Sequence, residues 1–267
     1  MLKKTIQNLL WKLNYDISKL NSEKINIKDL IYRLHPIKLK NTKMVRIGNP
    51  SGDGGYLVPD ILNDIKYVFS LGVGNETSFE EDMIKKNIKC FSADYSVNKP
   101  KIESMNFEFT KKFVKSYNSN YSLRFDDWKN TYLGDDYVSN ILLQIDIEGD
   151  EYSVIPTIDS KTMLQTKIMI VEFHHLTRIL DHKYQKYIIS CFERILEYFS
   201  PVHLHVNNSS NVLVNSDYEI PHLLEATFVN KNCVSNYEYV NEFPSLLDRP
   251  CVHDKKEIVL PKSWFRN

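Results

Sequence analysis

The 267-residue chain lacks the features that would place it in several large classes of protein. Its four cysteines are far apart and form no CxxC pair, so neither a disulfide framework nor a zinc motif is indicated, and reduced thiols in a cytoplasmic protein are expected. Lys and Arg (34) balance Asp and Glu (34), which argues against a nucleic-acid partner. No signal-peptide core is present, and no apolar stretch approaches the roughly 20 residues of a membrane span.

Helical spacing of apolar residues marks the first 40 residues. Leu9 and Leu13 share one face of a first helix, Leu30 and Leu34 share one face of a second, and Pro36 ends that second helix. We expect a helical appendage over residues 1–40 that packs on a main domain of residues 41–267 or on a second subunit, so a homodimer is compatible with the sequence.

Strand and helix signals alternate through the main domain. This alternation predicts an α/β fold with a mostly parallel sheet and helices on both faces. The last two predicted strands have no clear helix between them, which favours an antiparallel hairpin at the sheet edge. The expected strands are 67–71, 89–93, 107–109, 141–145, 168–175, 202–208 and 223–229, and the clearest helix covers 182–199.

A glycine turn follows the first of these strands. Gly72 and Gly74 separate the strand from a helix that Ser78 can cap, and Asp94 closes the next strand about twenty residues later, where such folds place a carboxylate on ribose hydroxyls. The dinucleotide fingerprint GxGxxG has its third position occupied by Thr77 here. A cofactor with a ribose and no pyrophosphate therefore fits better than NAD, and S-adenosylmethionine is that cofactor.

Two further segments combine glycine with acidic residues. Asp53-Gly54-Gly55-Tyr56 is either a plain hairpin turn or a loop that lies against a ligand, and we favour the loop. The buried strand 141–145 ends at Asp146 and runs into Glu148 and Gly149. This block is either a solvated turn or a set of ligand groups in the crevice beyond the carboxyl ends of the strands.

Together these segments resemble the FkbM-like S-adenosylmethionine-dependent methyltransferases. The resemblance runs from Arg46 to about Lys231. It implies a Rossmann-like methyltransferase fold with a seven-stranded sheet and, for many bacterial members, O-methylation of a sugar or natural-product hydroxyl. The motifs that carry it are Asp53-Gly54-Gly55-Tyr56, Gly72-Val73-Gly74, Asp126-Asp127-Trp128, Asp146-Ile147-Glu148-Gly149-Asp150-Glu151, Glu172-Phe173-His174 and His205-Val206-Asn207-Asn208.

The resemblance assigns site residues as follows. Gly72 and Gly74 line the methionine end of the cofactor, Asp94 holds the ribose, and Asp126 or Asp127 lies near the adenine. The full set expected around the cofactor is Asp53, Gly54, Gly55, Tyr56, Gly72, Gly74, Asp94, Tyr95, Asp126 and Asp127. The set expected around the substrate is Glu148, His175, His205, Asn207 and Asn208.

Methyl transfer to a sugar hydroxyl needs a base, and His174 follows the fifth strand at the edge where the substrate should lie. The hypothesis makes His174 the base, with Asp146 or Glu172 orienting it; the alternative is a strand-end histidine bonded to backbone. A possible divalent-metal set is Asp146, Glu172, His174 and His205, but their spacing matches no metal motif, so no metal is predicted. The expected substrate is a nucleotide-linked sugar for a bacterial capsule or surface polysaccharide. The rival functions are an NAD-dependent nucleotide-sugar oxidoreductase and a non-catalytic partner protein with the same fold.

Overall fold

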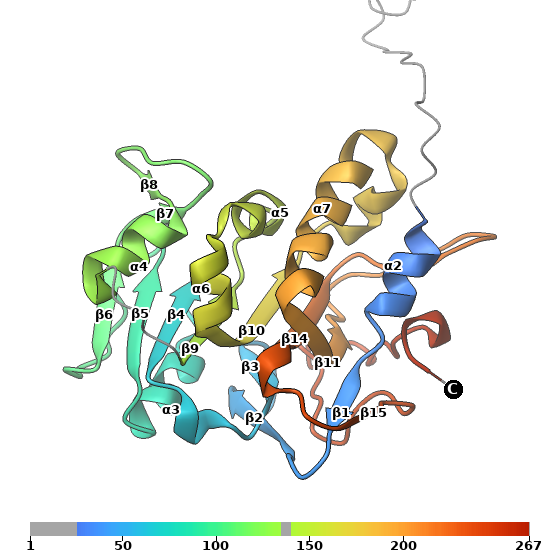
Figure 1. Cartoon of the computed structure of the whole chain (residues 1–267), viewed down its shortest axis with the longest axis horizontal. Coiled ribbons are helices and arrows are strands. Elements are labelled where there is room, and N and C mark those ends of the chain that lie inside the picture. The colour runs from blue at the N-terminus through green and yellow to red at the C-terminus, as the bar shows by residue number, and fades with distance from the viewer. Residues whose placement is uncertain (1–25, 135–139, 267) are drawn as a thin grey trace, which may run out of the picture.

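The computed structural model describes residues 26–134 and 140–266. A seven-stranded sheet forms its centre, in the order β11-β14-β10-β9-β4-β5-β6 (Figure 1). Its strands are β4 (Tyr67–Leu71), β5 (Lys89–Ala93), β6 (Phe107–Thr110), β9 (Ile141–Ile145), β10 (Thr166–Phe173), β11 (Phe199–Val206) and β14 (Leu224–Asn230).

Five neighbouring strands of this sheet, β10-β9-β4-β5-β6, are parallel, and β14 runs antiparallel to both β10 and β11. The predicted α/β class with a mostly parallel seven-stranded sheet is confirmed, and the fold is Rossmann-like. The two last strands do pair antiparallel, but β14 lies inside the sheet and β11 forms the edge. A small separate hairpin, β12 (Val212–Val214) with β13 (Glu219–Pro221), lies between them in the sequence.

Helices cover one face of the sheet, as Figure 1 shows for α4, α6 and α7. Alternate side chains of the strands, such as Phe69, Leu143 and Val171, join the core on this face, while Val68, Leu142 and Ile170 face the other way. The helices on the first face are α4 (Phe125–Leu133), α5 (Glu151–Val154), α6 (Ser160–Gln165) and α7 (His182–Tyr198), with short turns η2 (Ile155–Thr157) and η3 (Leu176–Leu180).

The opposite face is covered by a helix and a hairpin and, over β11 and β14, by β1 (Ile37–Leu39). Helix α3 (Ser78–Lys85) and the hairpin of β2 (Met44–Gly48) with β3 (Gly55–Pro59) pack there through Phe79, Met83 and Val58. The smaller elements are β1 paired with β15 (Tyr237–Tyr239), β7 (Phe113–Val114) paired with β8 (Ser122–Leu123), and the turns η1 (Leu62–Asp64), η4 (Lys231–Cys233) and η5 (Lys262–Trp264).

The predicted second helix of the N-terminal segment is present as α2 (Ile27–Arg33). Its apolar face joins the main core, and Arg33 forms a two-pronged ion pair with Glu193 of α7 at 2.6 and 2.8 Å. The first predicted helix, around Leu9 and Leu13, lies outside the described residues. Within the described part of the chain, no helix is long and apolar enough to cross a membrane.

Candidate functional site

The glycine turn after β4 is pinned to the end of β5 by a carboxylate. Asp94 Oδ2 accepts hydrogen bonds from the backbone N–H groups of Val73 at 3.2 Å and Gly74 at 3.0 Å. Gly72 has φ +79°, and a Cβ there would lie 1.8 Å from the backbone oxygen of Asp146. The turn therefore needs glycine at position 72 both for its backbone conformation and for the close approach of the loop after β9.

The other oxygen of Asp94 is also occupied. Asp94 Oδ1 accepts from the backbone N–H and the hydroxyl of Ser96, each at 2.7 Å. A carboxylate offers about four lone-pair positions, and all four are used here by the chain itself. Asp94 thus fixes the shape of the turn, and a ligand hydroxyl binds it by replacing one of these donors.

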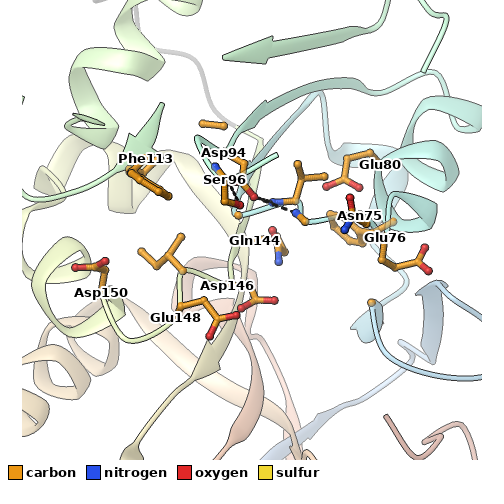
Figure 2. A pocket seen from close by; sticks show the side chains of 18 of the residues that line it. Asn75, Glu76, Glu80, Asp94, Ser96, Phe113, Gln144, Asp146, Glu148 and Asp150 are labelled. Carbon is orange, nitrogen blue, oxygen red and sulfur yellow. Dashed lines mark hydrogen bonds between the residues drawn. The ribbon is translucent and has the colours of Figure 1, made fainter. Parts of the chain in front are cut away.

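A cavity of about 540 Å³ opens beside this turn, within the range of small-molecule sites. Figure 2 shows Phe113 and Asp150 on one side of it and Asn75 and Glu76 on the other, with Asp94 and Asp146 between them. Seven acidic residues line it, namely Asp53, Glu76, Glu80, Asp94, Asp146, Glu148 and Asp150. Lys115 is the single basic residue in that lining, and it forms an ion pair with Asp150. The cavity therefore attracts cations and repels anions.

A chain of polar side chains runs under the cavity. Ser70 Oγ lies 2.5 Å from Glu80 Oε1 and 2.8 Å from Gln144 Oε1, and the Gln144 amide donates to the Tyr56 hydroxyl at 3.3 Å. Burial raises the pKa of Glu80 to about 7, although the Ser70 hydrogen bond opposes the rise. This chain fixes the Tyr56 ring at the cavity wall.

The Asp53–Tyr56 segment lies at the turn of the hairpin of β2 and β3, and it reaches the cavity. Asp53, Gly54 and Tyr56 line it, while Gly55 packs in β3 against Arg46. Gly54 has φ +76°, and a Cβ there would lie 2.5 Å from the Glu76 side chain. The small residue lets the loop approach the segment that carries Glu76.

His174 lies behind the cavity wall. Its Nδ1 is 2.7 Å from Glu151 Oε1, and its Nε2 is 3.3 Å from Glu148 Oε2 and 3.8 Å from Asp146 Oδ1. Glu151 is completely buried. Burial lowers the pKa of His174, but the Glu151 hydrogen bond and the three acidic neighbours outweigh it, so the pKa is raised. Asp146 and Glu148, which line the cavity, stand between His174 and a ligand.

Asp146 has the electrostatics of a base near neutral pH. Burial raises the pKa of its carboxyl to about 7; His174 opposes this rise and Glu148 adds to it. The donor atoms of Asp146, Glu148 and His174 lie within 4.8 Å of one another, a spacing that also suits a divalent cation. His175 is turned elsewhere, with φ +53° and its Nδ1 3.1 Å from Nε2 of His222.

The remaining predicted base partner, Glu172, belongs to a second group of polar residues. The Asn207 amide donates to Glu172 Oε1 at 2.8 Å, and burial raises the pKa of the Glu172 carboxyl well above its usual value. His205 lies 2.6 Å from Glu225, its partner across β11 and β14. The structure thus separates the four residues that the sequence offered as a possible metal set. Asp146 and His174 lie together, whereas Glu172 and His205 lie beside Glu225.

Asn208, predicted to bind substrate, holds the C-terminal segment. Its amide donates to the carbonyls of Val252 at 3.0 Å and Lys255 at 3.1 Å, and its oxygen accepts from Val252 N–H at 2.8 Å. None of His175, His205, Asn207 and Asn208 lines the cavity, in contrast to Glu148.

Three residues predicted near the cofactor also lie away from the cavity. Asp126 accepts from Asp159 N–H at 2.8 Å and from the Thr162 hydroxyl at 2.5 Å, so it joins α4 to the start of α6. Asp127 accepts from the Asn118 amide at 2.6 Å on the surface. The Tyr95 ring packs against Phe113 and Tyr121 with centroids 5.2 Å apart in each pair, one ring behind the cavity.

Several residues of this site escaped sequence reasoning. The polarity of Gln144 inside an apolar strand could have identified it, and so could the place of Glu151 in the acidic block. Ser96, Phe113 and Lys115 line the cavity from a segment of mixed polar composition that carries no pattern.

Comparison with known proteins gives no family. No family model matches the chain, and no curated protein matches it. A fibrillarin pre-rRNA processing protein of Methanococcus jannaschii is 11% identical with a TM-score of 0.37, over 73% of this chain and 84% of that one. A putative hemolysin from Streptococcus thermophilus is 11% identical with a TM-score of 0.36, over 64% of this chain and 61% of that one. At such TM-scores neither likeness assigns a function.

Proposed function

We propose that this protein is an S-adenosylmethionine-dependent O-methyltransferase. The observation that carries the proposal is the acidic cavity at the ends of β4 and β5, beside a glycine turn pinned by Asp94. S-adenosylmethionine carries a cationic sulfonium centre, an amino group and a ribose, all of which suit carboxylate-rich walls. The resemblance of the sequence motifs to the FkbM-like methyltransferases points the same way.

The residues present fit that cofactor. Asp94 and Ser96 are placed to exchange one of their mutual hydrogen bonds for a ribose hydroxyl. Gly74 has open space around it, since a Cβ added at this position would meet no atom within 4 Å, so its backbone is free to contact the ligand. When bound, the cofactor would supply an electrophilic methyl group: a nucleophilic oxygen would bond to the methyl carbon as the C–S bond breaks, and S-adenosylhomocysteine would leave.

The acceptor hydroxyl needs a group that takes its proton, and we assign that role to Asp146. This carboxylate lines the cavity, whereas His174 lies behind it and opposes the rise that burial causes in the Asp146 pKa. Glu151 fixes the His174 ring through Nδ1. In this proposal Asp146 is the base, in place of the His174 of the sequence hypothesis, and His174 and Glu151 are positioning residues.

The acceptor is proposed to be a sugar hydroxyl, as the family resemblance implies. A nucleotide-linked sugar of a bacterial capsule or surface polysaccharide, made in the cytoplasm, is the proposed context. Because the cavity is lined by seven acidic residues and one paired lysine, the diphosphate of such a substrate has to remain outside it. The same argument disfavours NAD, whose pyrophosphate would lie among these carboxylates.

The first experiment is a thermal melt with S-adenosylhomocysteine, with NAD and with buffer. A ligand at ~100 times its Kd adds about 2.7 kcal/mol of stability, which in a domain of this size raises Tm by roughly 5–10 °C. We expect the shift with S-adenosylhomocysteine alone. It should be lost in Asp94→Asn and kept in Asp127→Asn, since only Asp94 lines the cavity.

A Tm shift with NAD alone would overturn the methyltransferase proposal and favour the NAD-dependent oxidoreductase. A shift with S-adenosylhomocysteine, followed by no methyl transfer to a panel of free and nucleotide-linked sugars, would favour the non-catalytic partner protein. Methyl transfer from labelled cofactor, followed by mapping of the methylated oxygen, completes the assignment.

A further inference from the structure

A second cluster of side chains with ligand chemistry lies on the far half of the sheet edge. His205 on β11, Glu225 on β14 and Cys251 of the C-terminal segment offer one nitrogen, one oxygen and one sulfur atom, all within 4.8 Å of one another. The three residues come from distant parts of the chain, which is why the cysteine spacing in the sequence gives no sign of them. His205 and Glu225 are buried, and Cys251 is half-buried.

The contacts within this cluster converge on Glu225. Nδ1 of His205 lies 2.6 Å from one oxygen of the carboxylate, and the Cys251 thiol donates to the other at 3.3 Å. A cation placed between the three atoms replaces the two protons that now point at Glu225. Zinc bonds of about 2.0–2.3 Å to such donors put the ligand atoms about 3.3–3.7 Å apart around a tetrahedron, so only small shifts are needed.

The far side of the imidazole has the partner that a metal-bound histidine usually has. His205 Nε2 lies 2.8 Å from Glu257 Oε1, which fixes Nδ1 as the nitrogen that faces Glu225. Ligating histidines commonly give their second N–H to a carboxylate in this way. The second oxygen of Glu257 is buried without a hydrogen-bond partner, so the contact with His205 is the hydrogen bond that orients this carboxylate.

The surroundings carry an excess of negative charge. Glu225 also lies within 4.8 Å of the carboxylates of Asp53 and Glu172. Arg46 lines the same small space, but its guanidinium donates to the carbonyls of Asn49 at 2.8 Å and Gly52 at 2.6 Å. A divalent cation would balance the buried carboxylates of Glu172 and Glu225 and the exposed one of Asp53.

We propose that His205, Glu225 and Cys251 bind a zinc ion that fastens the C-terminal segment to β11 and β14. Nitrogen, oxygen and thiolate donors together are the set that zinc prefers. Asp53 and Glu172 lie within 4.8 Å of Glu225, and Asp53 also lines the cavity. The site is independent of the methyltransferase proposal, since it is built from residues on the other half of the sheet edge.

The test measures metal directly. Purified full-length protein is incubated with Zn²⁺, desalted and analysed for zinc by mass spectrometry, and a second sample is loaded with Co²⁺ for absorption spectroscopy. We expect one zinc per chain and a thiolate-to-cobalt charge-transfer band. Cys251→Ser should lose the band and weaken zinc binding at least tenfold, while Cys233→Ser, which changes another half-buried cysteine outside the cluster, should keep both.

A third variant tests Glu257, the carboxylate that contacts His205 without being a proposed zinc ligand. Glu257→Gln should keep the cobalt band but weaken zinc binding about 10- to 100-fold. Wild-type protein that retains no zinc and shows no thiolate-to-cobalt band would overturn the proposal, even if the Cys251 variant failed to fold. Equal zinc retention by folded Cys251→Ser would overturn it as well, and His205 would then be a protonated imidazole held between two carboxylates.

Discussion

The two halves of the carboxyl edge of the sheet treat acidic residues in opposite ways. Beyond β4, β5 and β9, Asp94 and Asp146 face a cavity of about 540 Å³. Beyond β10, β14 and β11, Glu172 and Glu225 are buried, paired with Asn207 and with His205. A strand-end carboxylate can meet a small molecule from solution only where no other segment of the chain covers it, and here contacts from residues 248–257 cover one half.

The largest expected effect comes from a substitution in the open half of the sheet edge, which is the half beside the cavity. Asp146→Asn should lower kcat about 10²- to 10⁴-fold, the usual contribution of a positioned base. The Kd of S-adenosylhomocysteine should stay within a few-fold, and turnover is measured with saturating cofactor. Asp127→Asn is the control, because that carboxylate lies on the surface outside the cavity lining and its loss should matter little. If His174→Asn alone abolished turnover while Asp146→Asn kept it, His174 would be the base.

The pH dependence of the rate is a second test of Asp146 as the base. A base must be ionised to accept a proton, so kcat/KM should rise with pH through the Asp146 pKa of about 7. His174 lowers that pKa, so His174→Asn should move the rising limb to higher pH as well as reduce the rate. A profile in His174→Asn that keeps its midpoint would mean that His174 has only a structural role.

The next effect concerns stability, and it compares two glycines in the turn after β4, which belongs to the open half of the sheet edge. Gly72 and Gly74 both have positive φ, but a Cβ at position 72 would lie 1.8 Å from the Asp146 backbone oxygen, and one at 74 meets nothing within 4 Å. Gly74→Ala should lower the free energy of unfolding by about 1–2 kcal/mol, which is the cost of a left-handed backbone conformation for a residue with a Cβ. Gly72→Ala should cost at least about 2 kcal/mol more, since backbone must move. Urea unfolding of both variants measures the difference, and equal losses would contradict it.

The smallest expected effect concerns the covered half. Asn208→Ala removes three hydrogen bonds to the segment around Val252, at a cost of about 1–3 kcal/mol in unfolding free energy. Limited proteolysis should then cut the C-terminal segment sooner, while KM for the acceptor stays unchanged. A raised KM with unaltered stability would restore the substrate-binding role that the sequence motif suggested for Asn208.

Much of the sheet could be predicted because its strands are short apolar runs. β4 and β9 match their predicted limits, and the helix predicted over 182–199 is α7 at His182–Tyr198. Limits at the far edge slipped: β11 begins at Phe199 rather than Val202, because its first residues pair with the end of β14.

The site was less predictable, since the direction of each acidic side chain is set by the turn that carries it. Glu148 and Gly149 both have positive φ, and this turn sends Glu151 inward to His174 while Glu148 stays outside. Asp126 is taken by the start of α6, a contact that sequence adjacency does not reveal. Phe113 and Lys115 approach the cavity only through the pairing of β7 with β8.

The position of β14 has a consequence for how the protein is made. Within the described part of the chain, β11 pairs in the sheet with β14 alone, and β14 is synthesised later. A nascent chain that ends after β11 therefore exposes the free edge of β10 and a hydrophobic strand with nowhere to pair, both of which invite association with other chains. The ribosome has to deliver residues 224–230 before this side of the sheet is protected.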